Sequence, residues 1–329
     1  MAKIDYLEAL HQALDEELGR DQRLTIFGED VGGVKGGVFN VTQGLAEKYG
    51  DRRVFNMPLG EAEIGGLAIG LGTTGHPAVA EFQFADYILP ATNQIISEAA
   101  RMRYRSQGDW TVPVVFRAPY GGGVGGGFYH SQSTEKVFVG QPGLRVVTPS
   151  TVRDAKGLLK SAIRCQDPVL FYEHKRLYHS IKAEIDPNEE ILTPIDKAAI
   201  LRSGTDLTVM SYGVTLQYVL QAADELTQQG LHTEVVDIRS LYPLDKATII
   251  AAAKKTGKVL LVNEDNQQGG VLSEISAVIN EGALFDLDAP IQRLAGPDSP
   301  AMPYAKNLEQ AFLVQADAVK QAMLDLAEF

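Results

Sequence analysis

The feature that most constrains this 329-residue chain is a repeated alternation of short apolar runs with segments that are apolar at helical spacing. Three of the runs in the first half are LTIFGED, PAVAEFQF and VPVVFR. The segments with helical periodicity between and around the runs cover residues 4–18, 61–72, 87–105 and 151–165. Short strands that alternate with helices predict an α/β fold, a parallel sheet with helices on both faces.

The alternation stops once, at about residues 183–196. This stretch, AEIDPNEEILTPID, is acidic, contains two prolines and lacks periodicity, which is typical of a linker. Strand-like runs then resume with LTVMS, TEVVDI and KVLLVNE, and a last helix is expected over residues 307–327. We therefore predict a first domain over residues 1–185, a linker over 186–196 and a second domain over 197–329.

The charge of the chain limits its partners. It has 30 basic and 42 acidic residues, a net charge of −12, which argues against a nucleic-acid binder because such proteins need a basic surface. The net charge is −1 over residues 1–185 and −11 over residues 186–329. An asymmetry of this size often reflects a binding partner.

Cysteine content and hydropathy indicate the compartment. Cys165 is the single cysteine, so a disulfide framework and a cysteine-based zinc site are excluded, as expected in a reducing cytoplasm. The first twenty residues form an acidic amphipathic pattern rather than a signal peptide. The longest uncharged run, residues 64–80, is broken by glycines and a proline, and we expect no membrane span.

A glycine cluster is the most unusual local feature. Six of the seven residues 121–127 are glycine, and His130, Ser131 and Gln132 follow closely. Ordering so many glycines is costly, so such a stretch usually persists where backbone closely approaches a ligand or another chain. The alternative is a mobile surface loop. The lack of a following Lys-Ser or Lys-Thr pair argues against a P-loop.

Two further motifs carry candidate site residues. Pro58-Leu59-Gly60 precedes Glu61, which places that acid at the start of a predicted helix; the alternative is a carboxylate that only favours the helix dipole. Gln83 and Tyr87 lie between a strand and a helix, where open α/β sheets bind ligands. Their alternative is a set of core aromatic residues. The chain has no Gly-x-Ser-x-Gly motif and its six histidines are scattered, which argues against a serine hydrolase and a metal cluster.

Long ordered motifs give these residues a common context. They are MPLGEAEIGG, AEFQFADYILPATNQIISEAARMRYRSQG, FYHSQS, RVVTPSTVRDAKGLLKSAI, DPVLFYEHK and RLAGPDSPAMPYA. Over nearly the whole chain the sequence resembles the β subunit of the thiamine-diphosphate-dependent decarboxylating component of 2-oxoacid dehydrogenase complexes. The resemblance implies a pyrimidine-binding thiamine-diphosphate domain followed by a transketolase C-terminal-like domain, which dimerises and docks the acyltransferase.

The resemblance also implies roles for single residues. Glu61 would hydrogen-bond N1′ of the cofactor's aminopyrimidine and so assist deprotonation of the thiazolium, while the cofactor acts as electron sink for loss of CO2. Leu59 would contact the pyrimidine through its backbone, Gln83 would line the ring and Tyr87 would stack on it. His130 would assist transfer of the acyl group to a lipoyl arm.

Family members hold a structural potassium ion in this subunit, mainly through backbone carbonyls. The matching positions here are Ala162, Cys165 and Asp167, together with carbonyls near Val114. Because a hard cation prefers oxygen ligands, Cys165 would serve through its carbonyl oxygen.

The sequence departs in one respect from a complete thiamine-diphosphate enzyme, and this departure bears on which subunits must assemble. The chain has no Gly-Asp-Gly motif, which such enzymes use with a later Asn to hold magnesium and the diphosphate. The resemblance therefore implies an α subunit that holds magnesium, an α2β2 heterotetramer, and contacts with the subunit-binding and lipoyl domains of a dihydrolipoyl acyltransferase. Branched-chain substrates are favoured over pyruvate and acetoin. A non-catalytic scaffold and a self-sufficient transketolase-like enzyme are the competing interpretations.

Overall fold

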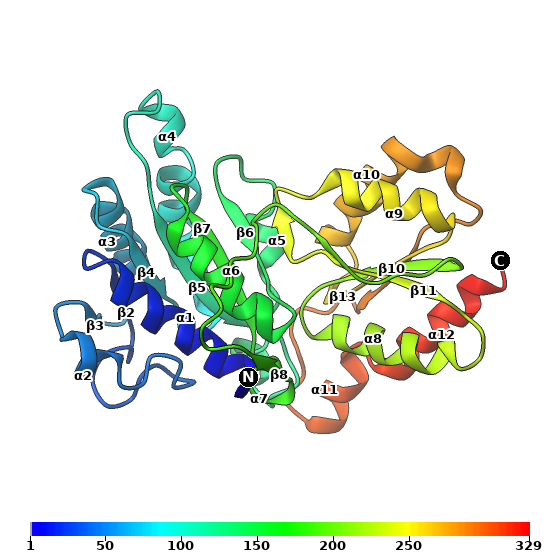
Figure 1. Ribbon diagram of the computed structural model, residues 1–329, viewed down its shortest axis with the longest axis horizontal. Helices are drawn as coiled ribbons and strands as arrows, with labels where there is room; N and C mark the ends of the chain where they lie inside the picture. Colours follow the sequence, from blue (N-terminus) through cyan, green and yellow to red (C-terminus); the bar gives the residue numbers. More distant parts are fainter. Residues whose placement is uncertain (1) are drawn as a thin grey trace. The chain divides into compact units, whose positions relative to one another are not determined.

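A computed structural model describes residues 2–329, and the chain divides into two compact units (Figure 1). The first unit contains the described residues up to Tyr120 and Phe138–Ile195. The second unit contains Gly121–Val137 and Asp196–Phe329. The glycine cluster, which lies within the first predicted domain, therefore groups with the second unit.

The first unit is built on a parallel sheet with the strand order β6-β7-β5-β4-β2-β3. Its central strands are mostly apolar and are buried along their whole length, as expected when helices cover both faces of the sheet. A separate antiparallel pair joins β1 to β8. The strands of this unit are β1 (Ala2–Asp5), β2 (Thr25–Gly28), β3 (Val54–Asn56), β4 (Ala78–Glu81), β5 (Val114–Tyr120), β6 (Arg145–Val147), β7 (Val169–His174) and β8 (Lys182–Ile185).

Two helices of the first unit begin at residues whose side chains cap them. The carboxylate of Asp5 caps α1, and the hydroxyl of Thr151 caps α6. These two helices pack against each other (Figure 1). The helices of this unit are α1 (Tyr6–Arg20), α2 (Leu45–Tyr49), α3 (Glu61–Thr73), α4 (Met102–Arg105), α6 (Val152–Arg164) and α7 (Leu177–Ser180).

The continuous helix predicted over residues 87–105 is wrong. The chain instead forms two 3-10 turns, Ala85–Tyr87 and Leu89–Ala91, then a π-helical segment, Asn93–Ala99, and only then α4. Pro90 accounts for the start of this irregularity, because it has no N–H to donate and its ring clashes with the carbonyl four residues earlier.

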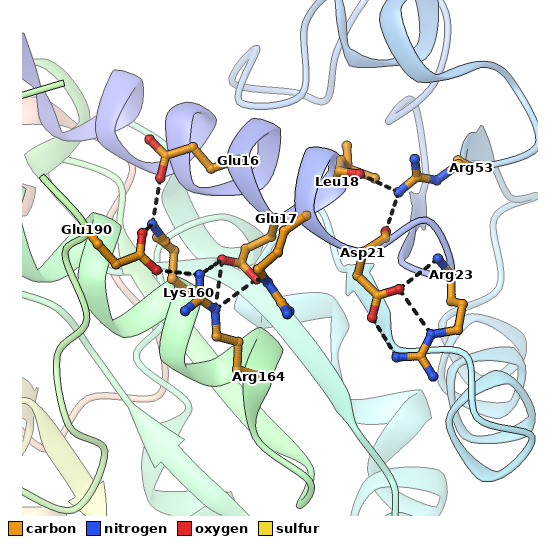
Figure 2. Close-up of polar contacts among 10 residues, drawn as sticks. Glu16, Glu17, Leu18, Asp21, Arg23, Arg53, Lys160, Arg164 and Glu190 are labelled. Carbon is orange, nitrogen blue, oxygen red and sulfur yellow. Dashed lines mark hydrogen bonds and ion pairs between the residues drawn. The ribbon is translucent and has the colours of Figure 1, made fainter. Parts of the chain in front are cut away.

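Ion pairs fasten α1, α6 and the predicted linker together (Figure 2). The Lys160 ammonium lies 2.6 Å from carboxylate oxygens of both Glu16 and Glu190. Arg164 bonds the buried carboxylate of Glu17 and also Glu190, each at 2.6 Å. The segment that the sequence presents as a linker is therefore held on the surface of α6.

The second unit is a smaller α/β layer with the strand order β14-β13-β10-β11-β9, in which only β9 runs antiparallel. Figure 1 shows α9 and α10 on one face of this sheet and α8 and α12 on the other. Its elements are α5 (Glu135–Phe138, which reaches the first unit by one residue), β9 (Ala199–Arg202), β10 (Leu207–Ser211), α8 (Val214–Thr227), β11 (Thr233–Asp237), β12 (Ser240–Tyr242), α9 (Lys246–Thr256), β13 (Val259–Asn266), α10 (Val271–Ala283), β14 (Gln292–Gly296), α11 (Lys306–Phe312) and α12 (Ala316–Ala327).

The last predicted helix, over residues 307–327, is also interrupted. The chain forms α11, leaves the helical conformation at Leu313 and Gln315, which are extended, and then forms α12. Leu313 and Val314 are both buried. In extended backbone adjacent side chains point to opposite sides, so Val314 joins the core cluster of the second unit while Leu313 lies next to Gly122.

Between residues 2 and 329 no helix is long and apolar enough to cross a membrane.

Candidate active site

The predicted motifs of the first unit lie at one edge of its sheet. Gly28, the last residue of β2, is in register with Asn56 of β3 and with Glu81 of β4. Because carboxyl ends of parallel strands meet at one edge, the segments that follow these strands, residues 29–30, 57–60 and 82–87, emerge side by side. This is where an open α/β sheet binds its ligand.

Glu61 is the first residue of α3 and is half-buried. Gly60 adopts an extended conformation before it, and the Gly60 carbonyl accepts the N–H groups of Glu63 and Ile64. The helix therefore starts without a side-chain cap, and its positive end faces the same edge as Glu61. Leu59, which precedes the turn, is 85% exposed, so its surface is available to a ligand or another chain.

Glu29 is a site residue that the sequence interpretation missed. It follows β2, only 5% of its surface is exposed, and its Oε1 has no hydrogen-bond partner in residues 2–329. Burial raises the pKa of Glu29, the nearby charge of Glu61 raises it further, and the Gly60 amide opposes this. The run LTIFGED ends in two acids, and this could have flagged the position.

Tyr87 shares this space with the two acids. It ends a 3-10 turn, and its ring meets Phe84 edge to face at 5.6 Å between centroids. Burial raises the pKa of the Tyr87 hydroxyl, with smaller contributions from the charges of Asp86, Glu61 and Glu29. Gln83 is half-buried two residues beyond β4. The structure thus brings Leu59, Glu61, Gln83 and Tyr87 to one edge.

A buried ion cluster supports this edge from below. Arg117 of β5 donates to Glu81 at 2.6 Å and to both carboxylate oxygens of Glu173, at 2.5 and 2.8 Å. The Tyr178 hydroxyl donates to Glu173 at 2.9 Å. One fully buried guanidinium therefore links the last residue of β4 to β5 and β7, and so fixes the strand end from which Gln83 emerges.

His130 belongs to the second unit, whereas Glu61 belongs to the first. It follows the 3-10 turn Gly127–Tyr129 and is half-buried. The segment around it closes on itself, because the Gly121 amide donates to the Gln132 carbonyl at 3.2 Å and the Gln132 side chain donates to the Phe128 carbonyl at 3.0 Å. These two hydrogen bonds close residues 121–132 into a loop.

The predicted potassium ligands lie where α6 ends. The Ala162 carbonyl accepts the Cys165 amide at 3.1 Å, and the Asp167 amide approaches the Cys165 sulfur at 3.4 Å. The Asp167 carboxylate bonds Arg103 at 2.6 Å and Arg145 at 3.3 Å. Since both carboxylate oxygens of Asp167 face guanidinium groups, only its carbonyl suits a cation.

Within residues 2–329 no cluster of three or more His, Cys, Asp or Glu side chains is arranged to hold a metal. A cavity of about 1160 Å³ lies beside Asp167 and is lined by residues such as Arg101, Arg103 and Tyr104. Its lining includes none of the residues of the Glu61 edge, so this cavity is separate from that edge.

Comparison with known proteins identifies the family. Residues 2–180 match the transketolase pyrimidine binding domain, and residues 196–319 match the transketolase C-terminal domain. The chain is 56% identical to the 2-oxoisovalerate dehydrogenase subunit beta of Bacillus subtilis, with all of both chains covered. It is 47% identical to the pyruvate dehydrogenase E1 component subunit beta of the same organism, with 91% of each covered.

More distant comparisons agree. The 2-oxoisovalerate dehydrogenase subunit beta of Pseudomonas aeruginosa is 46% identical, over 92% of this chain and 89% of that one. A solved split-gene transketolase, described as an inactive beta4 tetramer, superposes with a TM-score of 0.79 at 22% identity, over 99% of this chain and 98% of that one. That likeness concerns the fold alone.

The chain belongs to the transketolase-like family of 2-oxoacid dehydrogenase β subunits. This is a family of oxidoreductases whose first domain is of the type that binds the pyrimidine of thiamine diphosphate. The resemblance drawn from the motifs and the predicted α/β fold of two transketolase-type domains are both confirmed.

Proposed function

We propose that this chain is the β subunit of an α2β2 branched-chain 2-oxoacid dehydrogenase component, which decarboxylates a 2-oxoacid and passes the acyl group to a lipoyl group. The observation that carries the proposal is the 56% identity, over the full length of both chains, with a 2-oxoisovalerate dehydrogenase subunit beta. Pyruvate is the second candidate substrate because a pyruvate dehydrogenase β subunit is 47% identical.

The Glu61 edge suits the pyrimidine of thiamine diphosphate. That ring is flat and offers a basic nitrogen and an amine, and the edge offers the Tyr87 ring, the Glu61 carboxylate and the unsatisfied buried oxygen of Glu29. Leu59 and Gln83 would complete the contact. When bound, thiamine diphosphate supplies the electron sink for loss of CO2. Glu61 would hold and return the proton at N1′.

We infer that the diphosphate and its magnesium are held by an α subunit. The chain has no Gly-Asp-Gly motif, so it lacks the residues that hold these groups in a complete enzyme of this type. The exposed Leu59 beside the site is consistent with another chain covering it.

Residues 1–185 would form the pyrimidine-binding domain, and residues 197–329 would dimerise and dock the subunit-binding domain of a dihydrolipoyl acyltransferase. His130 would act when the lipoyl domain arrives, because one imidazole nitrogen can donate a proton while the other accepts one.

Potassium bound by carbonyls of Ala162, Cys165 and Asp167 would stabilise the end of α6. Replacing potassium by sodium should lower the melting temperature of the tetramer, and an unchanged value would remove this site.

The substrate proposal has a direct test. The chain is combined with its α subunit, and turnover is compared on 3-methyl-2-oxobutanoate and pyruvate with the same acyltransferase lipoyl domain. We expect the branched substrate to give the higher kcat/KM. Faster turnover of pyruvate would instead assign the chain to the pyruvate enzyme. A tetramer that assembles but decarboxylates neither substrate would support a scaffold.

A further inference from the structure

The segment that contains His130 is unusually well fastened for a chain so rich in glycine. The segment runs from Gly121 to Val137 and is part of the second unit, although β5, the strand just before it, is part of the first. A segment with six glycines in seven positions has little intrinsic preference for one conformation. Something outside it must therefore determine the position of His130.

The part of the segment before His130, residues 121–129, is its first arm, and two carboxylates hold it through hydrogen bonds. The Gly122 amide donates to Glu264 Oε1 at 2.6 Å. The Gly123 and Gly125 amides both donate to Glu309 Oε1, at 2.9 and 3.2 Å. Gly123 and Gly125 have φ values of 81° and 72°, in the left-handed region that glycine adopts without strain.

This geometry resembles the concave arrangement of amides that binds anions in other proteins. Here the anions are the chain's own carboxylates, because Glu264 and Glu309 are both buried against the loop. Hydrogen bonds from amides to a buried carboxylate are stronger than neutral ones. The glycines therefore serve an internal anion, and these three amides are not available to a phosphate.

The part of the segment after His130, residues 131–137, is its second arm. It contacts the end of β13, the strand that carries Glu264. The Lys136 ammonium lies 3.2 Å from Asp265 Oδ1 and also bonds the side chain of Asn266. The Tyr212 hydroxyl donates to Glu135 Oε1 at 2.9 Å. Glu264 and Asp265 are consecutive residues near the end of β13, so one strand terminus contacts both arms.

We infer that Glu309, Glu264 and Asp265 are positioning residues, which fix both arms of the segment 121–137 and thereby place His130 for the acyl-transfer step. This inference rests on the role of His130 in the proposed function. It assigns to the second unit a direct part in the reaction, in addition to dimerisation and docking. A displacement of about 1 Å at a reacting group costs on the order of 100-fold in rate, so loosening one arm should be measurable.

The test uses the reconstituted α2β2 enzyme and the variants Glu309→Ala, Glu309→Gln and His130→Ala. Glu281→Ala is the matched control, because Glu281 is an exposed carboxylate of the same unit on α10. Two rates are compared: reduction of the lipoyl domain, and decarboxylation coupled to an artificial electron-accepting dye, which bypasses acyl transfer. Hydrogen exchange of the peptide covering residues 121–132 reports directly on the loop.

We expect Glu309→Ala to slow lipoyl reduction by about tenfold or more, to change the dye rate less than twofold, and to accelerate exchange in the loop. Glu309→Gln keeps an acceptor oxygen and should recover part of the rate. Unchanged exchange together with unchanged lipoyl reduction would overturn the inference, as would equal losses in both assays. If Glu309→Ala fails to assemble, Asp265→Asn is measured by the same criteria.

The role of His130 is judged separately. If His130→Ala leaves lipoyl reduction intact, its part in the proposed function is wrong, and faster loop exchange in Glu309→Ala would then reflect only local structure, which overturns the positioning role as well. If His130→Ala slows lipoyl reduction but Glu309→Ala does not, only the positioning inference fails.

Discussion

Single carboxylates behave differently in the two units because their immediate surroundings differ. Glu81 is buried in the first unit, and burial raises its pKa while the charge of Arg117 opposes the rise. Glu135 of the second unit is equally buried, but its nearest charges include the carboxylates of Asp265 and Glu264. Burial, reinforced by Asp265, raises the pKa of Glu135 to about 8.

The raised pKa of Glu135 predicts a pH-dependent stability. An unfolded Glu has a pKa of about 4.5, so between that pH and about 8 the native protein binds a proton that the unfolded chain has released. The contribution of this group to stability is therefore greatest below about pH 4.5 and falls as pH rises to 8, by at most about 1.4 kcal/mol per pH unit.

Urea unfolding at several pH values checks this prediction. Glu135→Gln, which keeps the shape of the side chain and removes its charge, should flatten the decline between pH 5 and 8 and raise the free energy of unfolding at pH 8. Glu281→Gln should leave the profile unchanged. Parallel profiles for the wild-type protein and Glu135→Gln would contradict the prediction.

Glu61 allows a second prediction at this scale. Glu61→Gln should lower decarboxylation in the reconstituted tetramer by about 10²–10⁴-fold, because general acid–base catalysis contributes that much. Glu63→Gln is the matched control, since Glu63 is an exposed carboxylate in the same first turn of α3. Melting temperatures should agree among the three proteins. A Glu61→Gln tetramer with wild-type turnover would show that this carboxylate is not the catalytic acid.

The candidate site residues could be predicted from the motifs that contain them, but not from the chemistry of each residue by itself. The motifs drew attention to Glu61, Gln83 and Tyr87, which the structure places at one sheet edge, although their roles stay predictions. Glu29 was missed because an acid after a strand is unremarkable by itself. Its significance comes from burial beside Glu61, which requires the end of β2 to pair with the end of β3, the strand that leads into α3.

At the scale of elements, buried strands were predictable and irregular segments were not. Runs such as LTIFGED and VPVVFR correspond to β2 and β5, because a short, continuous apolar run between turn residues is typical of a strand buried on both faces. The pair of β1 and β8 gave no such signal, since both strands are short and largely exposed. The π-helical segment 93–99 keeps apolar residues near helical spacing, so periodicity alone describes it as ordinary helix.

The ion pairs that hold the predicted linker against α6 lead to a prediction about the stability of this segment. Glu190→Gln removes two ion pairs, those with Lys160 and Arg164, while Lys160 keeps Glu16 and Arg164 keeps Glu17 (Figure 2). Because Glu190 is largely exposed, stability should fall by no more than about 1 kcal/mol.

Cleavage is the more sensitive measurement here. Limited proteolysis near residues 186–195 should be several-fold faster in Glu190→Gln than in the wild-type protein, and wild-type cleavage should itself accelerate at high salt, which screens exposed pairs. Glu184→Gln, a change at an exposed residue of β8, should have neither effect. Equal cleavage rates would mean that backbone packing, not charge, holds the segment.

At the scale of the whole molecule, the charge is distributed very unevenly. Residues 186–329 carry a net charge of −11, whereas residues 1–185 carry −1. The first part is proposed to meet an α subunit and an anionic cofactor, so a neutral surface suits it. The second part is proposed to dock the small basic subunit-binding domain of an acyltransferase, and opposite charges accelerate and orient such docking.

This distribution predicts salt-dependent docking. The affinity of the isolated subunit-binding domain for the α2β2 enzyme should weaken steadily as salt rises from low to physiological concentration, mainly through a slower association rate. Titration calorimetry and stopped-flow mixing at three salt concentrations measure both quantities. A constant affinity would show that the acidity of the second part serves another purpose.

The segment 121–137 belongs to the second unit, although the residues before and after it in the sequence belong to the first. This limits where the chain can be cut into two fragments that each fold. A fragment that begins at residue 197 would lack the glycines whose amides satisfy Glu264 and Glu309, and so would leave two buried carboxylates without these donors. A fragment that ends near residue 195 would carry the same segment with nothing to dock on. Separately expressed halves should therefore be poorly soluble, whereas co-expressed halves should complement each other.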